Sequence, residues 1–160
     1  MCSQRICRSG AKRRGAVAVE FAIVAPMLLS IVVGLVELTR VYDIQNSLET
    51  AAREGARFAA MDRTDMLLPG QTANAKLIQD VTNFLASSGI SANDVTVNIH
   101  PIGDPTQGFN LDDPANDLQL FTVDVQVPYS AVSYTPVSTV NDYTLSASVT
   151  FRNGRATLSQ

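Results

Sequence analysis

A long uncharged segment near the N-terminus dominates the hydrophobic pattern of the chain. Residues 21–36 carry no charge, and the apolar run continues over 16–19 on the other side of Glu20. A helix over 16–36 would be about 32 Å long, which just crosses a hydrocarbon core of about 30 Å. The pattern therefore predicts a single transmembrane helix at 16–36.

Beyond residue 36, apolar residues recur at three- and four-residue steps, as in an amphipathic helix. Residues 37–61 contain no proline, so we expect the helix to continue over this range. Small residues spaced by four let another backbone approach closely, either the sheet of this chain or a neighbouring helix. The candidate packing residues are Ala51, Ala52, Gly55, Ala56 and Ala59.

Charged residues lie between these small residues in the sequence. Arg53 is placed for an ion pair with Glu49 one turn earlier, and Arg57 is placed for a similar pair with Glu54. Arg53, Glu54 and Arg57 form either a solvated face of the helix or a contact with another subunit.

The spacing of apolar residues changes in the second half of the chain. After Pro69 and Gly70, the spacing of apolar residues predicts a second helix at about 72–87, with Gly89 as its C-terminal stop. Its buried face would consist of Leu77, Ile78, Val81, Phe84 and Leu85. Alternating apolar and polar residues then predict half-buried, antiparallel strands at 95–99, 121–127 and 143–151, and a short edge strand near 132–137 is an option. We expect an α+β domain over 62–160. The second half of the long N-terminal helix, at 37–61, would pack on the small sheet of this domain.

Charge is distributed unevenly along the chain. The first fourteen residues hold five of the 12 Lys and Arg residues and no acid, whereas the rest carries seven bases against 15 acids. A basic cluster directly before an apolar segment predicts a cytoplasmic N-terminus, with the remainder translocated. No aromatic residues alternate with these bases, so nucleic-acid binding is not expected.

Glu20 is unusual in such a segment, because a carboxylate near the bilayer centre costs a few kcal/mol. Either Glu20 lies at the cytoplasmic interface and the span begins at Phe21, or its carboxylate has a function within the membrane. Removal of the segment as an ordinary signal peptide is not expected, because the apolar core runs directly into a charged stretch at 37–40 without a suitable cleavage site.

The residues around Gly15 resemble the processing site of type IV prepilins, in which a membrane peptidase cuts after glycine and the fifth mature residue is glutamate. Here RRG at 13–15 is followed by AVAVEF at 16–21, so Glu20 would be the fifth residue. Together with Pro26 and the segment AAREGAR at 51–57, residues 12–61 resemble the TadE-like family, minor pilins (pseudopilins) of the tight-adherence, or Flp, pilus.

The resemblance implies a pilin-like fold and a role in assembling a pilus for surface attachment. Residues 1–15 would be a leader removed by prepilin peptidase, with Gly15, Ala16, Glu20 and Phe21 as the processing site. Glu20 would set the register between subunits by meeting the new amino terminus of a neighbour. The implied partners are other pilins and pseudopilins, an inner-membrane assembly platform and membrane lipid. The chain would cross the cytoplasmic (inner) membrane once, with its domain extracytoplasmic.

Candidate catalytic chemistry is sparse. His100 is the single histidine, Cys2 and Cys7 would leave with the leader, and no phosphate loop, zinc-protease motif or nucleophile elbow occurs. The acidic residues of 103–117 do not have the spacing of an EF-hand loop, and we expect a solvated loop without metal. We expect no cofactor and no enzymatic activity. Two alternatives remain: an unprocessed single-span envelope scaffold, and an anchored periplasmic enzyme.

Overall fold

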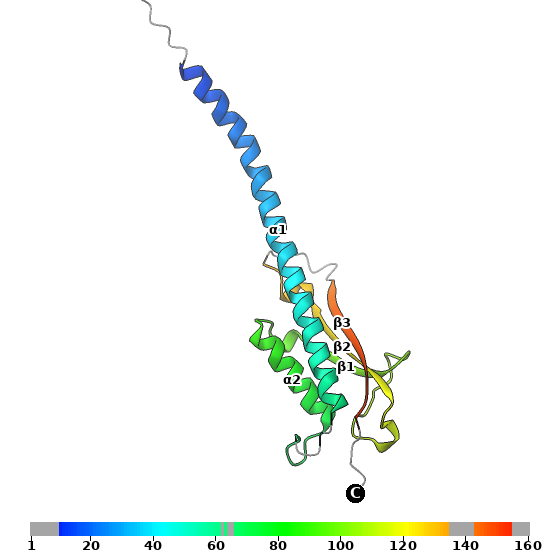
Figure 1. Ribbon diagram of the computed structural model, residues 1–160. Coiled ribbons are helices and arrows are strands. Elements are labelled where there is room, and N and C mark those ends of the chain that lie inside the picture. The colour runs from blue at the N-terminus through cyan, green and yellow to red at the C-terminus, as the bar shows by residue number, and fades with distance from the viewer. Residues whose placement is uncertain (1–9, 62, 64–65, 135–142, 155–160) are drawn as a thin grey trace, which may run out of the picture. The chain divides into compact units, whose positions relative to one another are not determined.

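The computed structural model describes residues 10–61, 63, 66–134 and 143–154 of the 160-residue chain (Figure 1). Two compact units are present, one up to Thr39 and one from Arg40 onward. The element order is α1 (Gly10–Ala60), α2 (Ala73–Ser87), β1 (Thr96–Pro101), β2 (Leu120–Pro128) and β3 (Thr144–Arg152), with short 3-10 helices η1 (Ala92–Asp94), η2 (Pro114–Asn116) and η3 (Tyr129–Ala131). The predicted α+β fold class, with a long apolar N-terminal helix and a second shorter helix, is confirmed.

Helix α1 is continuous from the apolar segment into the amphipathic one. It passes through Pro26, whose carbonyl accepts a hydrogen bond of 2.8 Å from the Ser30 hydroxyl. From Arg40 onward its apolar residues become buried at the expected steps, with Ile44 and Leu48 almost fully covered. The helix ends at Ala60, one residue before the predicted end.

Helix α2 begins and ends at local sequence signals. The Thr72 hydroxyl caps its N-terminus by accepting a hydrogen bond from the Ala75 amide, and Gly89 follows its end with a φ of +84°. Leu77, Val81 and Leu85 form its buried face.

Two apolar residues of α2 were expected on this buried face but are partly exposed. Ile78 is 40% exposed, because it lies about 100° around the helix from Leu77, at the margin of the apolar stripe. Phe84 is 37% exposed, because it lines an open pocket beside Ala51 of α1, whose small side chain covers little of the ring.

The three strands form one antiparallel sheet in the order β1-β2-β3. The register places Val123 opposite Ile99 on one side and Val149 on the other, so one face of the sheet is apolar. The opposite face carries mainly threonine, serine and other polar residues, as the alternation predicted. Residues 132–134, at the start of the expected edge strand, are not a strand, and the rest of that segment lies outside the described residues.

The core lies where the second half of α1 packs against α2 and the sheet. Figure 1 shows α2 beside this part of α1, with the three strands on the other side. Ala51, Ala52, Ala56 and Ala59 are fully buried, and they join the apolar residues of α2 and β2 in one cluster. Gln45 adds a polar link, because its amide donates to the Ser146 carbonyl at 2.8 Å.

The two helices are in close contact at Gly55. A Cβ atom at this position would lie 2.7 Å from Cγ2 of Val81 and 3.4 Å from Cδ2 of Leu77. Both neighbours belong to the buried face of α2, so they have little room to move. Gly55 therefore allows α1 and α2 to pack at this distance.

A buried polar cluster joins the end of α1 to two distant segments. The Arg63 guanidinium is only 2% exposed, and it donates to the carbonyls of Ala59 and Leu111 and to Oδ1 of Asn153. Asn153, 1% exposed, donates back to the Leu111 carbonyl, and the Gly154 amide donates to Ala59 at 3.0 Å. These bonds satisfy a carbonyl in the last turn of α1 and fix the end of β3 beside it.

We predict that Gly55→Leu destabilises the unit 40–160 by about 2–3 kcal/mol, because overpacking a tight core typically costs about 1–3 kcal/mol. Urea unfolding of a fragment comprising residues 40–160, followed by circular dichroism, measures this loss. Ala60→Leu is the matched control, because it adds the same side chain at an exposed position of α1 and should change stability by less than about 0.5 kcal/mol. Equal effects of the two substitutions would contradict the packing role of Gly55.

Candidate functional site

The first part of α1 has the properties of a membrane span. Within the described part of the chain, α1 is the one helix long and apolar enough to cross a membrane. None of its most apolar stretch is buried in the protein. Its large side chains are exposed throughout, from Val17 at 63% to Val36 at 52%. Such a surface requires lipid or other helices as its surroundings.

The proposed processing residues all lie on this exposed part of α1. Gly15, Ala16, Glu20 and Phe21 are helical and exposed, and no atom lies within 4 Å of a Cβ built on Gly15. Glu20 follows Ala16 by four residues, which places it about 6 Å further along the helix axis. Gly15 and the Glu20 side chain are therefore exposed on this part of the helix.

The small residues of α1 pack against other elements of the same chain. Ala51, Ala52, Ala56 and Ala59 are buried, and Gly55 contacts α2. The sequence had left open whether a sheet of the same chain or a neighbouring helix would cover this stripe. In the structure it lies in the core formed by this chain's own α2 and sheet.

Arg53, Glu54 and Arg57 lie on the solvent side of the same helix. Arg53 pairs with Glu49 at 3.0 Å, and Arg57 pairs with Glu54 at 3.8 Å, as the spacing predicted. The side chains of Arg53 and Arg57 remain about two-thirds exposed, so these pairs contribute little to stability. Their charged groups are accessible to a partner.

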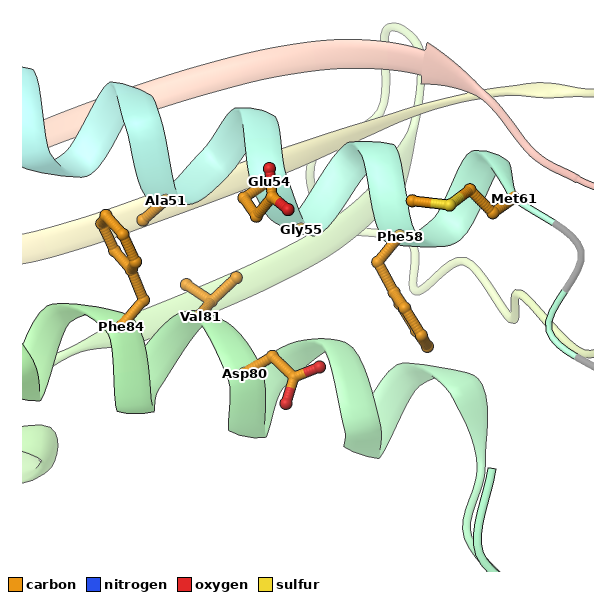
Figure 2. A pocket seen from close by; sticks show the side chains of 8 residues that line it. All are labelled: Ala51, Glu54, Gly55, Phe58, Met61, Asp80, Val81 and Phe84. Carbon is orange, nitrogen blue, oxygen red and sulfur yellow. The ribbon is translucent and has the colours of Figure 1, made fainter. Parts of the chain in front are cut away.

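A shallow pocket of about 140 Å³ lies between α1 and α2 (Figure 2). It is well below the volume of about 300–1,000 Å³ typical of small-molecule sites. Asp80 at its edge is paired with Lys76 of its own helix, and Glu54 is paired with Arg57. Its lining combines the small residues Ala51 and Gly55 of α1 with larger side chains, Glu54, Phe58, Met61, Asp80, Val81 and Phe84.

The acidic residues of 103–117 bind the backbone of their own segment and of α2. Asp112 accepts a hydrogen bond of 2.7 Å from the Ala73 amide at the start of α2, and Asp113 accepts one from the Ala115 amide. Asp104 accepts hydrogen bonds from the Thr106 hydroxyl and amide. These bonds hold the pKa of Asp104 below its usual value of 3.8, so this turn is favoured while the carboxyl is ionised and weakens as the pH falls through that lowered pKa.

His100 lies near enough to Asp104 for an electrostatic effect that also lowers the pKa of that carboxyl. Nδ1 of His100 lies 2.9 Å from the carbonyl of Pro101, at the end of β1. Among the described residues, no three His, Cys, Asp or Glu side chains are grouped so that they could hold a metal ion. Cys2 and Cys7 lie outside the described residues.

Residues 15–57 match the family model for TadE-like protein. The chain carries a TadE-like segment. The match begins at Gly15, includes Glu20, and ends at Arg57, the last residue of the AAREGAR segment. It confirms the resemblance seen in the sequence. No curated protein and no solved structure is significantly similar to the chain.

The structure also identifies residues that sequence reasoning did not find. Arg63, Asn153 and Gly154 lie outside the TadE-like segment, yet they hold the end of its helix. An Asn-Gly pair directly after a predicted strand was the one local signal for them, and it indicates a turn rather than a buried contact.

We predict that millimolar calcium leaves the thermal unfolding midpoint of the 40–160 fragment unchanged, because Asp104, Asp112 and Asp113 each accept hydrogen bonds from a different backbone segment. A calcium site occupied at a hundredfold excess over its Kd would add about 2.7 kcal/mol. Differential scanning calorimetry with calcium, with magnesium as the control, tests this. A rise in the midpoint with calcium alone would show that the acidic segment rearranges into a site.

Proposed function

We propose that the protein is a minor pilin, or pseudopilin, that takes part in assembling a tight-adherence (Flp, type IV-type) pilus for surface attachment. The observation that carries this proposal is the TadE-like match over 15–57, which falls on a helix with an exposed apolar first part. The α+β unit from Arg40 onward fits the body of such a subunit. No enzymatic activity is part of the proposal.

The proposal includes maturation by prepilin peptidase after Gly15. Gly15 has no side chain to obstruct a peptidase, and its surroundings in the structure are open. Cleavage would remove the basic leader and create a cationic α-amino group on Ala16. The mature chain would remain in the cytoplasmic (inner) membrane through 16–36, with its N-terminus on the cytoplasmic side and its folded unit outside.

Glu20 would then act between subunits. Its exposed carboxylate has no basic residue near it in the sequence from 16 to 36, so lipid surroundings would leave its charge uncompensated. The α-amino group of a neighbouring mature chain would supply the opposite charge at a fixed depth. A pair of this kind is favourable only when both partners are in place, which makes it suited to setting register.

The contacts within the chain restrict where other pilins and pseudopilins can bind. The small-residue stripe of α1 is buried in the subunit, so it is not available to a neighbouring helix. The exposed surfaces of α1 include the apolar segment 16–36 and the charged face formed by Arg53, Glu54 and Arg57. We propose that the first contacts the transmembrane helices of neighbours and the assembly platform, and that the second contacts a neighbouring subunit outside the membrane.

An unprocessed envelope scaffold is the main alternative, and the mature N-terminus distinguishes the two. We predict that mass spectrometry of the protein purified from its native host finds Ala16 at the N-terminus. Gly15→Leu should block this maturation, because the peptidase has to fit closely around the cut. Gly34→Leu is the matched control, because its surroundings are equally open and it lies away from the cut. Mature chains that retain residues 1–15 would rule out the pilin proposal.

We also predict that Glu20→Gln leaves insertion and the Ala16 terminus intact but reduces co-purification with other pilins, by about tenfold if the lost pair contributes about 1.4 kcal/mol. The amide keeps the size of the side chain and removes its charge. Glu37→Gln is the matched control, because it makes the same change at the other end of the apolar segment. Normal co-purification and piliation by the Glu20→Gln variant would exclude the register role, even if maturation at Gly15 is found.

A further inference from the structure

All four tyrosines of the chain belong to segments that meet at one end of the unit from Arg40 onward. Tyr42 is in the first turn of α1 within this unit, Tyr129 begins η3, Tyr134 follows η3, and Tyr143 directly precedes β3. In Figure 1 the start of β3 lies beside α1 at the level where the unit begins. This is the end at which the chain arrives from its apolar segment.

Direct contacts join these segments. The Arg40 guanidinium lies over the Tyr134 ring, 5.1 Å from its centroid, and its Nε donates to the Val132 carbonyl at 3.3 Å. The Tyr129 amide donates to the Tyr143 carbonyl at 2.7 Å. The first residue of the unit, Arg40, is thus linked to the loop after η3, and this loop is adjacent to the strand pair β2 and β3.

Three of the four tyrosines are more than half exposed to solvent. Tyr42 is 63% exposed, Tyr134 68% and Tyr143 72%. Tyrosine has an apolar ring and a polar tip, and it is enriched where a protein surface meets the membrane–water interface. We define Tyr42, Tyr134, Tyr143 and Arg40 as the tyrosine collar.

The collar has the right position and charge for a lipid surface. Arg40 follows Val36, the last residue of the uncharged segment, by four residues, or about 6 Å along a helix. This distance matches the headgroup layer that borders the hydrocarbon core. Glu37 and Asp43 flank Arg40 in the sequence, so the collar has no excess of positive charge and suits zwitterionic headgroups.

We propose that the tyrosine collar contacts the phospholipid headgroup layer on the extracytoplasmic side of the membrane. This inference rests on the membrane anchoring in the proposed function and adds a second lipid contact, made by the folded unit. The tyrosine rings enter the boundary between headgroups and acyl chains, and their hydroxyls bond to headgroup oxygens. The contact limits the rotation and tilt of the unit over the bilayer.

The composition of the chain offers a direct test, because it contains no tryptophan. The full-length protein is reconstituted in phosphatidylcholine vesicles as three single-tryptophan variants: Tyr134→Trp, Tyr143→Trp and, as the matched control, Phe151→Trp. Phe151 is 36% exposed and lies near the far end of β3, eight residues or about 26 Å of extended chain from Tyr143. Tryptophan emission is measured with and without lipid that carries a nitroxide on its headgroup. Circular dichroism establishes that each variant has the wild-type fold.

The expected result is at least twofold stronger quenching for Tyr134→Trp and Tyr143→Trp than for Phe151→Trp. Equal quenching of all three variants in vesicles that carry the protein would overturn the collar and leave the anchoring unaffected. The collar would also be overturned if neither collar variant is quenched and its tryptophan emission shifts to the blue as the protein concentration rises. That result would indicate a contact with a second copy of the chain. Failure of the wild-type protein to float with the vesicles would instead overturn the anchoring itself, and the collar with it.

Discussion

The close approach of α1 and α2 at Gly55 is the constraint on which the folded unit depends. With Cγ2 of Val81 only 2.7 Å from a Cβ at that position, any larger side chain requires that the Val81 side chain or one of the helices shifts. The alanines before and after Gly55 extend the same close contact along α1 and bring the sheet against its other side. The core therefore combines small residues on α1 with large residues on α2 and β2. The large side chains fill the space that the small residues of α1 leave.

The end of α1 depends on groups that come from far along the chain. A helix leaves its last carbonyls without partners in its own backbone. Here the amide of Gly154 and the guanidinium of Arg63 supply donors to Ala59, and Asn153 joins both to the loop at Leu111. A Cβ on Gly154 would lie 2.5 Å from the Met61 carbonyl, so a glycine is needed where the end of the sheet meets the end of the helix.

The regular elements were predictable because each has a local signal. Alternation in 121–127 identified β2, and Thr72 and Gly89 marked the two ends of α2. The buried role of Arg63 was not predictable, because it depends on carbonyls up to 48 residues away and no local pattern distinguishes a buried arginine from a surface one. The exposure of Phe84 was missed for a similar reason, since it depends on the small residues of a different helix. At the candidate site, Gly15 and Glu20 were identified through resemblance, and the structure adds that both are accessible.

The exposure of the apolar segment has an energetic consequence for any step that removes the subunit from a bilayer. Thirteen large apolar side chains between Val17 and Val36 are about half exposed or more. At about 1.5 kcal/mol each, their transfer from lipid to water would cost on the order of 20 kcal/mol. This exceeds the free energy of unfolding of a typical domain, about 5–15 kcal/mol. The lipid contacts of 16–36 are therefore worth more free energy than the fold of a typical domain, so extraction becomes favourable when other helices replace the lipid around 16–36 as it leaves.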